Sequence, residues 1–577
     1  MRLALLPELS RAILWQLVKP VLAMVRKSWP YRRLLKGKMP DRIVFHPFDA
    51  APRRLEDADA LLRGRFRFGG EVLEVKEGSI FDKPPPSRAW AAGLHGFAWL
   101  ASLSAAGGEA ARVLATNLIA QWLKRNARYS EPAWAPEVTA RRLINLFAHG
   151  RFVLANSDVL WRSKLYVSLR EQSRLLARSA AEAPDGLPRF EAAAAHTLSG
   201  ACLNDSPRRL ASGLERLESE IARQLLPDGG HASRSPEALF NAYRHVVMVM
   251  DALGAIDQPV PAALRSAHDR MAPMLRFFRL GDGRLALFNG GGEGDGKMIE
   301  ALLARDEVRG QPFAFAPHSG YHRLAAGRTL AVMDCGKPPD GAFSNEAHAG
   351  CLSFEISAGA QRIFVNCGAS HQPKWETVLR GTAAHSTVTL ADTSTSTVLQ
   401  PGLAHSLLGS RLLDGVATVQ TSRRETSNGW TVEASHDGYL APFGILHQRR
   451  LTLSPNGAAL TGGDWLVPRA GGKRPRGGIP FAARFHVHPE VRISPSQGGG
   501  ALLKLPSGEG WRFQAAGGEL SIEESVYLGG DTARRSEQLV VSGAVKDDTV
   551  ELEYTHKMDW YPIAPPPQTQ VVASLHK

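Results

Sequence analysis

Cysteine is scarce in this chain, and its scarcity excludes several classes of protein. The 577 residues include four cysteines, and no two of them have C-x-x-C spacing. A disulfide-stapled fold and a cysteine-based zinc or redox motif are therefore not expected. The four thiols are best interpreted as buried and free.

Long apolar runs are also missing. Pro7 and Glu8 interrupt the apolar N-terminus, and Lys19 with Pro20 ends the next run. No later stretch approaches the roughly 18 uncharged apolar residues of a membrane-spanning helix. The sequence thus predicts neither a cleavable signal peptide nor a transmembrane helix.

Acidic residues are outnumbered by basic ones. The chain has 69 Lys and Arg against 56 Asp and Glu, a formal charge of +13. Such an excess indicates a polyanionic partner, which could be nucleic acid, anionic lipid or acidic polysaccharide. Residues 1–42, however, hold ten basic residues against only Glu8 and Asp41, so +8 of the +13 lies there. We expect no nucleic-acid partner for the remainder.

Residues 1–45 form a basic arm with an amphipathic pattern. One face of a helix there would carry Ile13, Leu14, Leu17, Val21 and Val25. A basic amphipathic helix can lie on an anionic membrane, so residues 1–42 predict peripheral membrane contact. A helix that docks on the rest of the protein is the simpler alternative.

Two further regions and a tail follow the arm. Apolar residues recur at helical spacing within 46–310, with helical segments expected near 137–154, 160–180, 208–226, 236–255 and 261–278. Ser235, Pro236 and Glu237 provide an N-cap, a first-turn proline and an acid at one helix start. After the glycine-rich stretch 281–296 the pattern changes, and residues 315–560 contain short β-branched runs separated by turns. These runs favour an antiparallel sandwich, and 561–577 reads as a Pro-rich tail.

Several motifs in the second region carry a family resemblance. In order, they are Ser319-Gly320-Tyr321, the run 346–355, the run 362–368, Thr382 to Thr387, and His436-Asp437-Gly438-Tyr439. In this order and spacing they resemble the C-terminal domain of heparinase II/III-like polysaccharide lyases. The resemblance implies an α+β multidomain fold, with an N-terminal (α/α) toroid of helical hairpins followed by a C-terminal antiparallel β-sandwich.

The same resemblance implies β-elimination at a uronic acid within an acidic polysaccharide. A neutraliser stabilises the developing negative charge, and a tyrosine or histidine moves the proton. This chain has Gly186-Leu187-Pro188 and Ala238-Leu239 where the family carries its Asn-His element and its tyrosine. We therefore assign catalysis to the residues that remain, which are Tyr439, His231 and His436, and substrate binding to Arg234 and Glu346.

The resemblance also places a structural metal at His348, Asn366 and His385. Two imidazoles with a carboxylate suit Zn²⁺, whereas this chain has an amide at Asn366 where the family has an aspartate. A zinc ion held with help from Glu346 and a hydrogen-bonded pair of histidines without metal are the two alternatives.

Three functions follow from these patterns. The first is a lyase that acts on an acidic polysaccharide in the cell envelope or periplasm. The second is a non-catalytic glycan-binding or envelope-assembly protein on the same scaffold, either cytoplasmic or peripheral to the membrane. The third is a glycoside hydrolase, for which Glu137, Asp228 and Glu237 are available without a spacing that selects a pair.

Overall fold

The first part of the chain is helical. The computed structural model describes residues 5–51, 53–203, 205–306, 310–370, 372–469, 478–530, 532–546 and 548–560. Its larger region of helices comprises α1 (Leu6–Lys27), α2 (Trp29–Leu35), α3 (Leu55–Leu62), α4 (Arg88–His95), α5 (Trp99–Ala106), α6 (Gly108–Arg125), α7 (Pro136–Ala148), α8 (Gly150–Leu154), α9 (Val159–Ser179), α10 (Leu187–Leu203), α11 (Pro207–Gln224), α12 (Pro236–Gly254), α13 (Ala262–Phe277) and α14 (Gly296–Leu303). A small hairpin, β1 (Arg65–Phe68) with β2 (Glu71–Glu74), lies among them.

Local sequence explains where the helices begin and how closely they pack. The Ser235 hydroxyl accepts a hydrogen bond from the backbone N–H of Ala238 at the start of α12, as the sequence predicts. The alanine-rich helix α10 packs against α7, α11 and α12. At Gly200 a Cβ would lie 2.6 Å from the Cα of Leu210, so only glycine allows α10 and α11 to approach this closely.

A buried arginine organises the helical core. Arg142 of α7 is fully buried, and its guanidinium lies 4.1 Å from the ring centroid of Trp122. It donates hydrogen bonds to the carbonyls of His95 and Ala133 and to Oε1 of Gln172. Burial lowers the pKa of Arg142 to about 9, because no carboxylate compensates the lost hydration. These contacts hold the turns around α4 and α7 in place.

In the described residues, the second part of the chain contains three antiparallel sheets of five or more strands. The first contains β3 (Phe315–Ala316), β4 (Tyr321–Ala326), β5 (Thr329–Asp334), β6 (Phe354–Ala358) and β7 (Gln361–Arg362) in that order. The second contains β20 (Glu519–Tyr527), β21 (Arg534–Val545), β16 (Ile479–Val487) and β8 (Phe364–Val365), and β9 (Val388–Leu390) also pairs with β16. The third contains β12 (Val419–Thr426), β13 (Gly429–His436), β14 (Ile445–Leu453), β15 (Ala459–Pro468), β22 (Val550–Trp560), β19 (Gly510–Ala516), β18 (Gly500–Lys504) and β17 (Arg492–Ser496).

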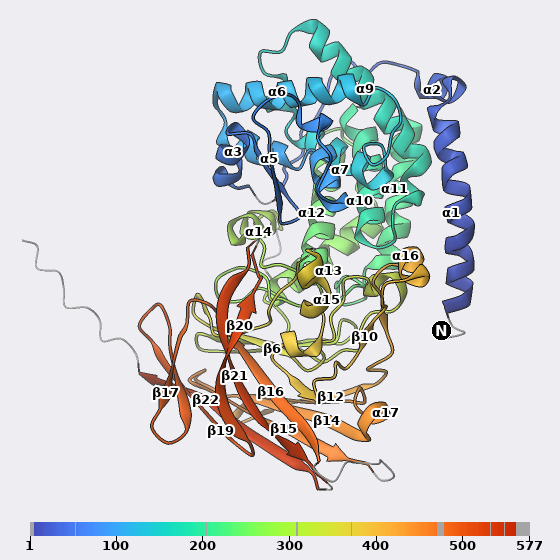
Figure 1. The fold of residues 1–577 in the computed structure, drawn as a ribbon. Coiled ribbons are helices and arrows are strands. Elements are labelled where there is room, and N and C mark those ends of the chain that lie inside the picture. Colours follow the sequence, from blue (N-terminus) through green and yellow to red (C-terminus); the bar gives the residue numbers. More distant parts are fainter. Residues whose placement is uncertain are drawn as a thin grey trace, which may run out of the picture.

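The sheets share one apolar core, to which Leu324 of the first, Phe485 of the second and Phe513 of the third belong. Shorter elements connect them, namely β10 (Thr397–Val398), β11 (Leu412–Leu413), α15 (Pro373–Leu379), α16 (Leu403–Leu408) and α17 (Leu440–Phe443). Figure 1 shows the helices on one side of the molecule and the sheets on the other. This confirms the predicted fold class, a toroid of helical hairpins followed by a β-sandwich. The tail 561–577 lies outside the described residues.

Helix α1 runs along the outer edge of the molecule, beside α16 (Figure 1). Of its 22 residues only Leu9 and Arg26 are buried. Three ion pairs fasten it, from Arg26 to Glu182, from Lys19 to Glu131 and from Glu8 to Arg411. Among the residues that the structure describes, neither α1 nor any other helix is both long and apolar enough to cross a bilayer.

Candidate functional site

His231, which the sequence assigns to catalysis, lies in the turn between α11 and α12 and is buried. Its Nε2 is 3.0 Å from Oε1 of Gln224, and its Nδ1 is 2.7 Å from the hydroxyl of Ser233. Burial lowers the pKa of His231 to about 4, and the nearby Arg223 adds to the shift. Both ring nitrogens are therefore engaged, and the neutral ring fixes the turn instead of facing a substrate.

Arg234 follows in the same turn and is also buried. Its role in substrate binding stays a prediction. Its guanidinium forms an ion pair with Asp334 at the end of β5 and donates to the carbonyl of Ser319 at 2.8 Å. It also donates to the carbonyl of Lys337 at 3.0 Å. Burial alone would lower the pKa of Arg234, but Asp334 keeps it above its ordinary value.

Other residues of this turn reinforce the joint between helices and sheets. Asp228 accepts hydrogen bonds from the backbone N–H groups of His318 and Ser319, at 2.9 and 2.6 Å. The Tyr321 hydroxyl donates to the carbonyl of Arg234 at 2.8 Å, and the Arg234 guanidinium lies 4.7 Å from the Tyr321 ring centroid. The segment expected to contact substrate is thus a structural joint.

Tyr439 is fully buried at the entrance to α17, and its assignment to proton transfer stays a prediction. Its hydroxyl lies 2.8 Å from the carbonyl oxygen of Val388 and 3.2 Å from that of Thr393. Burial raises the pKa of Tyr439 above its ordinary value. The hydroxyl therefore anchors the turn to β9 and keeps its proton.

His436 belongs to a buried hydrogen-bonded series of side chains, and its catalytic role stays a prediction. Its Nε2 is 3.0 Å from Nδ1 of His447, whose Nε2 is 2.7 Å from Oδ1 of Asp464. Arg449 donates to both oxygens of Asp464 at 2.8 Å. Burial lowers the pKa of His436 well below its ordinary value. The series links β13, β14 and β15 inside the third sheet.

The residues predicted to hold zinc do lie together, but they do not fit the ion. His385 Nδ1 donates to the carbonyl of Gly381 at 2.8 Å, so its Nε2 is an acceptor, and His348 Nδ1 lies 3.0 Å from it. His348 therefore donates a hydrogen bond from Nδ1 to Nε2 of His385. A metal ion at this position would need the lone pairs of both nitrogens. Asn366 donates to the carbonyl of Leu287 at 2.9 Å and accepts from the backbone N–H of Ser386 at 3.0 Å.

Asn366 thus serves as a bridge between two backbone segments. Within the described ranges, no group of three or more His, Cys, Asp and Glu side chains is arranged to hold a metal ion. Of the two alternatives in the sequence, the structure favours the hydrogen-bonded histidine pair. We derive no chemical step from zinc.

Glu346 is exposed and faces charged residues of the helical region. Its charge acts on Arg141 of α7 and, from the other side, on Arg380. Arg141 lies 2.9 Å from Glu191 of α10, and its side chain is 42% exposed. Glu191 raises the pKa of Arg141, with smaller contributions from Glu137 and Glu346.

Three carboxylates, those of Glu137, Glu191 and Glu346, therefore act on the partly exposed cation Arg141. Sequence reasoning missed Arg141 and Glu191. Glu137 and Arg141 are four residues apart, a spacing that predicts an ion pair on one helix face. Nothing in the sequence indicates that Glu191 of α10 pairs with Arg141. Two of the acids considered for glycoside hydrolysis are already hydrogen-bonded. The Asp228 carboxylate accepts from the backbone N–H of Ser319, and the Glu237 carboxylate accepts from the backbone N–H of Gly292 at 3.0 Å.

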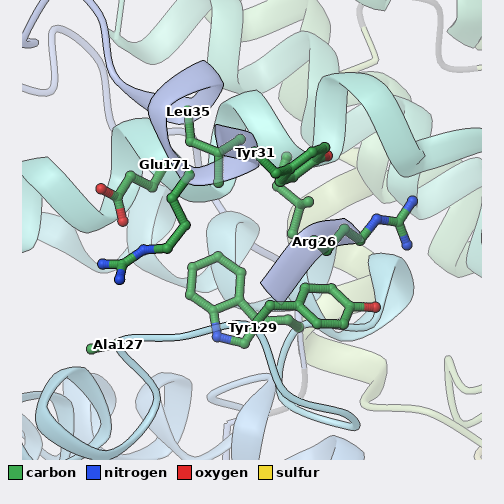
Figure 2. A pocket seen from close by; sticks show the side chains of 9 residues that line it. Arg26, Tyr31, Leu35, Ala127, Tyr129 and Glu171 are labelled. Atoms are coloured by element: carbon green, nitrogen blue, oxygen red, sulfur yellow. The ribbon is translucent and has the colours of Figure 1, made fainter. Parts of the chain in front are cut away.

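The cavity beneath α1 and α2 is small. Figure 2 shows Arg26, Tyr31 and Leu35 facing Tyr129 and Glu171 across it. Its volume is about 20 Å³, which suits a water molecule and not a substrate.

Comparison with known proteins places these features in context. Residues 308–555 match the family model described as "Heparinase II/III-like, C-terminal". The chain is 33% identical over 559 residues to FtsZ-localized protein C of Caulobacter vibrioides, covering 95% of this chain and 96% of that protein.

The fold has clear counterparts among solved structures. A crystal structure of heparinase III covers 96% of this chain and 92% of its own, with a TM-score of 0.70 and 14% identity. The heparan sulfate lyase HepC mutant from Pedobacter heparinus gives a TM-score of 0.59 and 17% identity, with 92% and 88% covered. At these identities the likeness concerns the fold alone.

The bridge formed by Asn366 yields a testable prediction. Asn366→Asp replaces a donor by an oxygen that faces the carbonyl of Leu287, so we expect a loss of about 1–3 kcal/mol in the free energy of unfolding. Zinc and chelator should leave the melting temperature of the unsubstituted protein unchanged. Differential scanning calorimetry measures both, with Asn428→Asp in an exposed turn as the control. Stoichiometric zinc in the purified protein, or an unchanged stability of N366D, would contradict this account.

Proposed function

Because the chain belongs to the heparinase II/III-like family while its candidate catalytic residues are internal, we propose that it is a non-catalytic envelope-assembly protein held on an anionic membrane surface by α1. The observation that carries the proposal is the exposed apolar face of α1. The burial and internal bonding of His231, Tyr439 and His436 support the absence of lyase chemistry.

The apolar face of α1 is broad and continuous. Its large exposed residues, with exposed fractions of 45–75%, are Leu6, Ile13, Leu14, Leu17, Val21, Met24 and Val25. At 3.6 residues per turn they occupy roughly 120° of the helix circumference, the width of a buried amphipathic face. In α2, Trp29 and Leu34 add to the exposed apolar surface. Such a patch on a monomer marks an interaction site.

The polar contacts of α1 decide between the two alternatives for this arm. The ion pairs to Glu131, Glu182 and Arg411 dock the helix through its polar side. The helix therefore does pack on the protein, yet it leaves its apolar face free. That orientation supports contact with a separate apolar phase.

Charge favours an anionic bilayer as that phase. Basic residues Arg11 and Lys27 lie at the two margins of the apolar face, and Arg32 and Arg33 follow in α2. Each basic residue near an anionic surface contributes about 1 kcal/mol to binding. Burial of several aliphatic side chains adds to this at about 25 cal/mol per Å².

The relative named FtsZ-localized protein C supports a site of action. We propose that this chain likewise localises with FtsZ at the membrane. An acidic polysaccharide is not part of the proposal.

Vesicle binding tests the role of α1. The full chain should co-sediment with phosphatidylglycerol vesicles, and less so with phosphatidylcholine vesicles or at high salt. The double variant Leu14→Asp, Leu17→Asp should weaken binding by at least about tenfold, since two charges would enter the apolar face. Val159→Asp with Leu160→Asp is the matched control, because these residues are equally exposed at the start of α9. Equal binding by the α1 variant and the control would refute the proposal.

An absorbance assay tests the absence of catalysis. Heparan sulfate, hyaluronan and alginate should yield no unsaturated, ultraviolet-absorbing product with the purified protein, while heparinase III provides the positive control. New reducing ends should be absent as well. A rise in ultraviolet absorbance would show that the protein is a lyase. New reducing ends without a rise in absorbance would show that it is a glycoside hydrolase.

A further inference from the structure

A polar pocket lies away from the joint and from the face around Arg141. Its volume is about 250 Å³, the space of about eight water molecules. Segments distant in sequence line it, and its charged and polar residues are Asp282, Arg284, Glu293, Gln361, Arg362, His488, Glu490 and Arg534. The pocket is close to the lower end of the range for small-molecule sites.

The floor of this pocket is a buried, fixed cation. Arg362 is 3% exposed and donates to Asp282 at 2.9 Å and to the carbonyl of Leu285 at 2.9 Å. Within the described residues its Nη1 has no hydrogen-bond partner; this atom is shut off from solvent and lies 3.7 Å from Oε2 of Glu355. Glu355 is already bonded to the backbone N–H groups of Leu287 and Asn366. The floor is therefore a fixed positive charge behind the pocket.

The acids near the floor are engaged by neighbours. Asp282 accepts from Arg362 and from the backbone N–H of Arg284. Glu293 accepts from the Arg284 side chain at 2.6 Å and from the hydroxyl of Tyr527. Neither carboxylate needs a ligand to satisfy it.

The groups that remain unused are mainly donors. Within the described part of the chain, the Arg534 side chain forms no hydrogen bond and pairs only loosely with Glu490, at 3.6 Å, with exposed fractions of 45% and 57%. His488 accepts from the N–H of Glu490 through Nδ1, so the neutral ring carries its proton on Nε2, which has no partner in the described residues. The Gln361 side-chain oxygen accepts from the N–H of Ser507, and its NH₂ group has no partner among the same residues.

We propose that this pocket binds a small anion of the size of one sugar ring, with a carboxylate or phosphate bound by Arg534 and His488 and hydroxyl groups facing Gln361 and Glu490. A surplus of preorganised donors selects an anionic group. The volume admits one ring and excludes a polymer. This site is independent of α1, so its failure would leave the membrane proposal untouched.

Isothermal titration of the full chain with glucuronate, glucose 6-phosphate, inorganic phosphate and glucose tests the proposal. At least one anionic sugar should bind with a Kd of about 1 mM or tighter, and glucose should not. The first two ligands distinguish a carboxylate site from a phosphate site. Arg534→Ala and His488→Gln should each weaken binding about tenfold. Glu490→Gln should strengthen it by up to about fivefold, because it removes a competing carboxylate.

Arg535→Ala is the matched control. Arg535 is the next residue of β21, points to the other face of the sheet and pairs with Glu524. The R535A variant should bind the anionic sugar with the affinity of the unsubstituted protein. The proposal would be overturned if neither anionic sugar bound at about 10 mM. It would also be overturned if inorganic phosphate bound as tightly as the sugars, or if R534A and R535A lost the same amount of affinity.

Discussion

The ion pair between Arg234 and Asp334 is the constraint on which the arrangement of the two regions depends. It joins the turn between α11 and α12 to the end of β5 inside the protein, with Arg234 7% exposed. The backbone of Arg234 adopts a left-handed conformation, with φ of 59°, which directs its guanidinium to the carbonyls of the first sheet. Removing one partner of such a pair typically costs about 3–5 kcal/mol, because the other charge is left buried.

The same physical requirement recurs at the other polar residues of the interior. Most buried polar groups in proteins are hydrogen-bonded, and the residues described above are satisfied by one another or by backbone. The chain His436, His447 and Asp464 links three strands, and Asn366 ties two backbone segments. The scaffold resembles that of polysaccharide lyases, whereas these side chains stabilise it. In the function that we propose, contact with other molecules is made by the surface, above all by α1.

Much of the fold could be predicted from the sequence, and less of the site. Hydrophobic periodicity and the cap at Ser235 predict helices correctly, because both are local properties. The apolar face of α1 is local too, and all five residues predicted for it are exposed. By contrast, Tyr439 and His231 occupy turns whose sequences are typical of exposed functional groups. Their burial depends on β9 and on Gln224, contacts that no sequence spacing reveals.

The pocket around Arg362 shows the same limit more strongly. It is lined by the linker after α13, the turn before β7 and the ends of β16 and β21. These segments meet only after the sheets have formed. In the sequence, nothing distinguishes the charged residues of this pocket from other surface charges. The proposed preference for an anion arises because the nearby carboxylates already have hydrogen-bond partners.

A double-mutant cycle between Arg234→Met and Asp334→Asn, followed by calorimetric unfolding of the full chain, tests the central claim most directly. If these residues are a structural joint, each single substitution should destabilise the protein, and the coupling free energy should reach about 2–3 kcal/mol. The double variant should also unfold with the helices and the sheets separating into two transitions. Additive effects within about 0.5 kcal/mol, with a single unperturbed transition, would contradict the account.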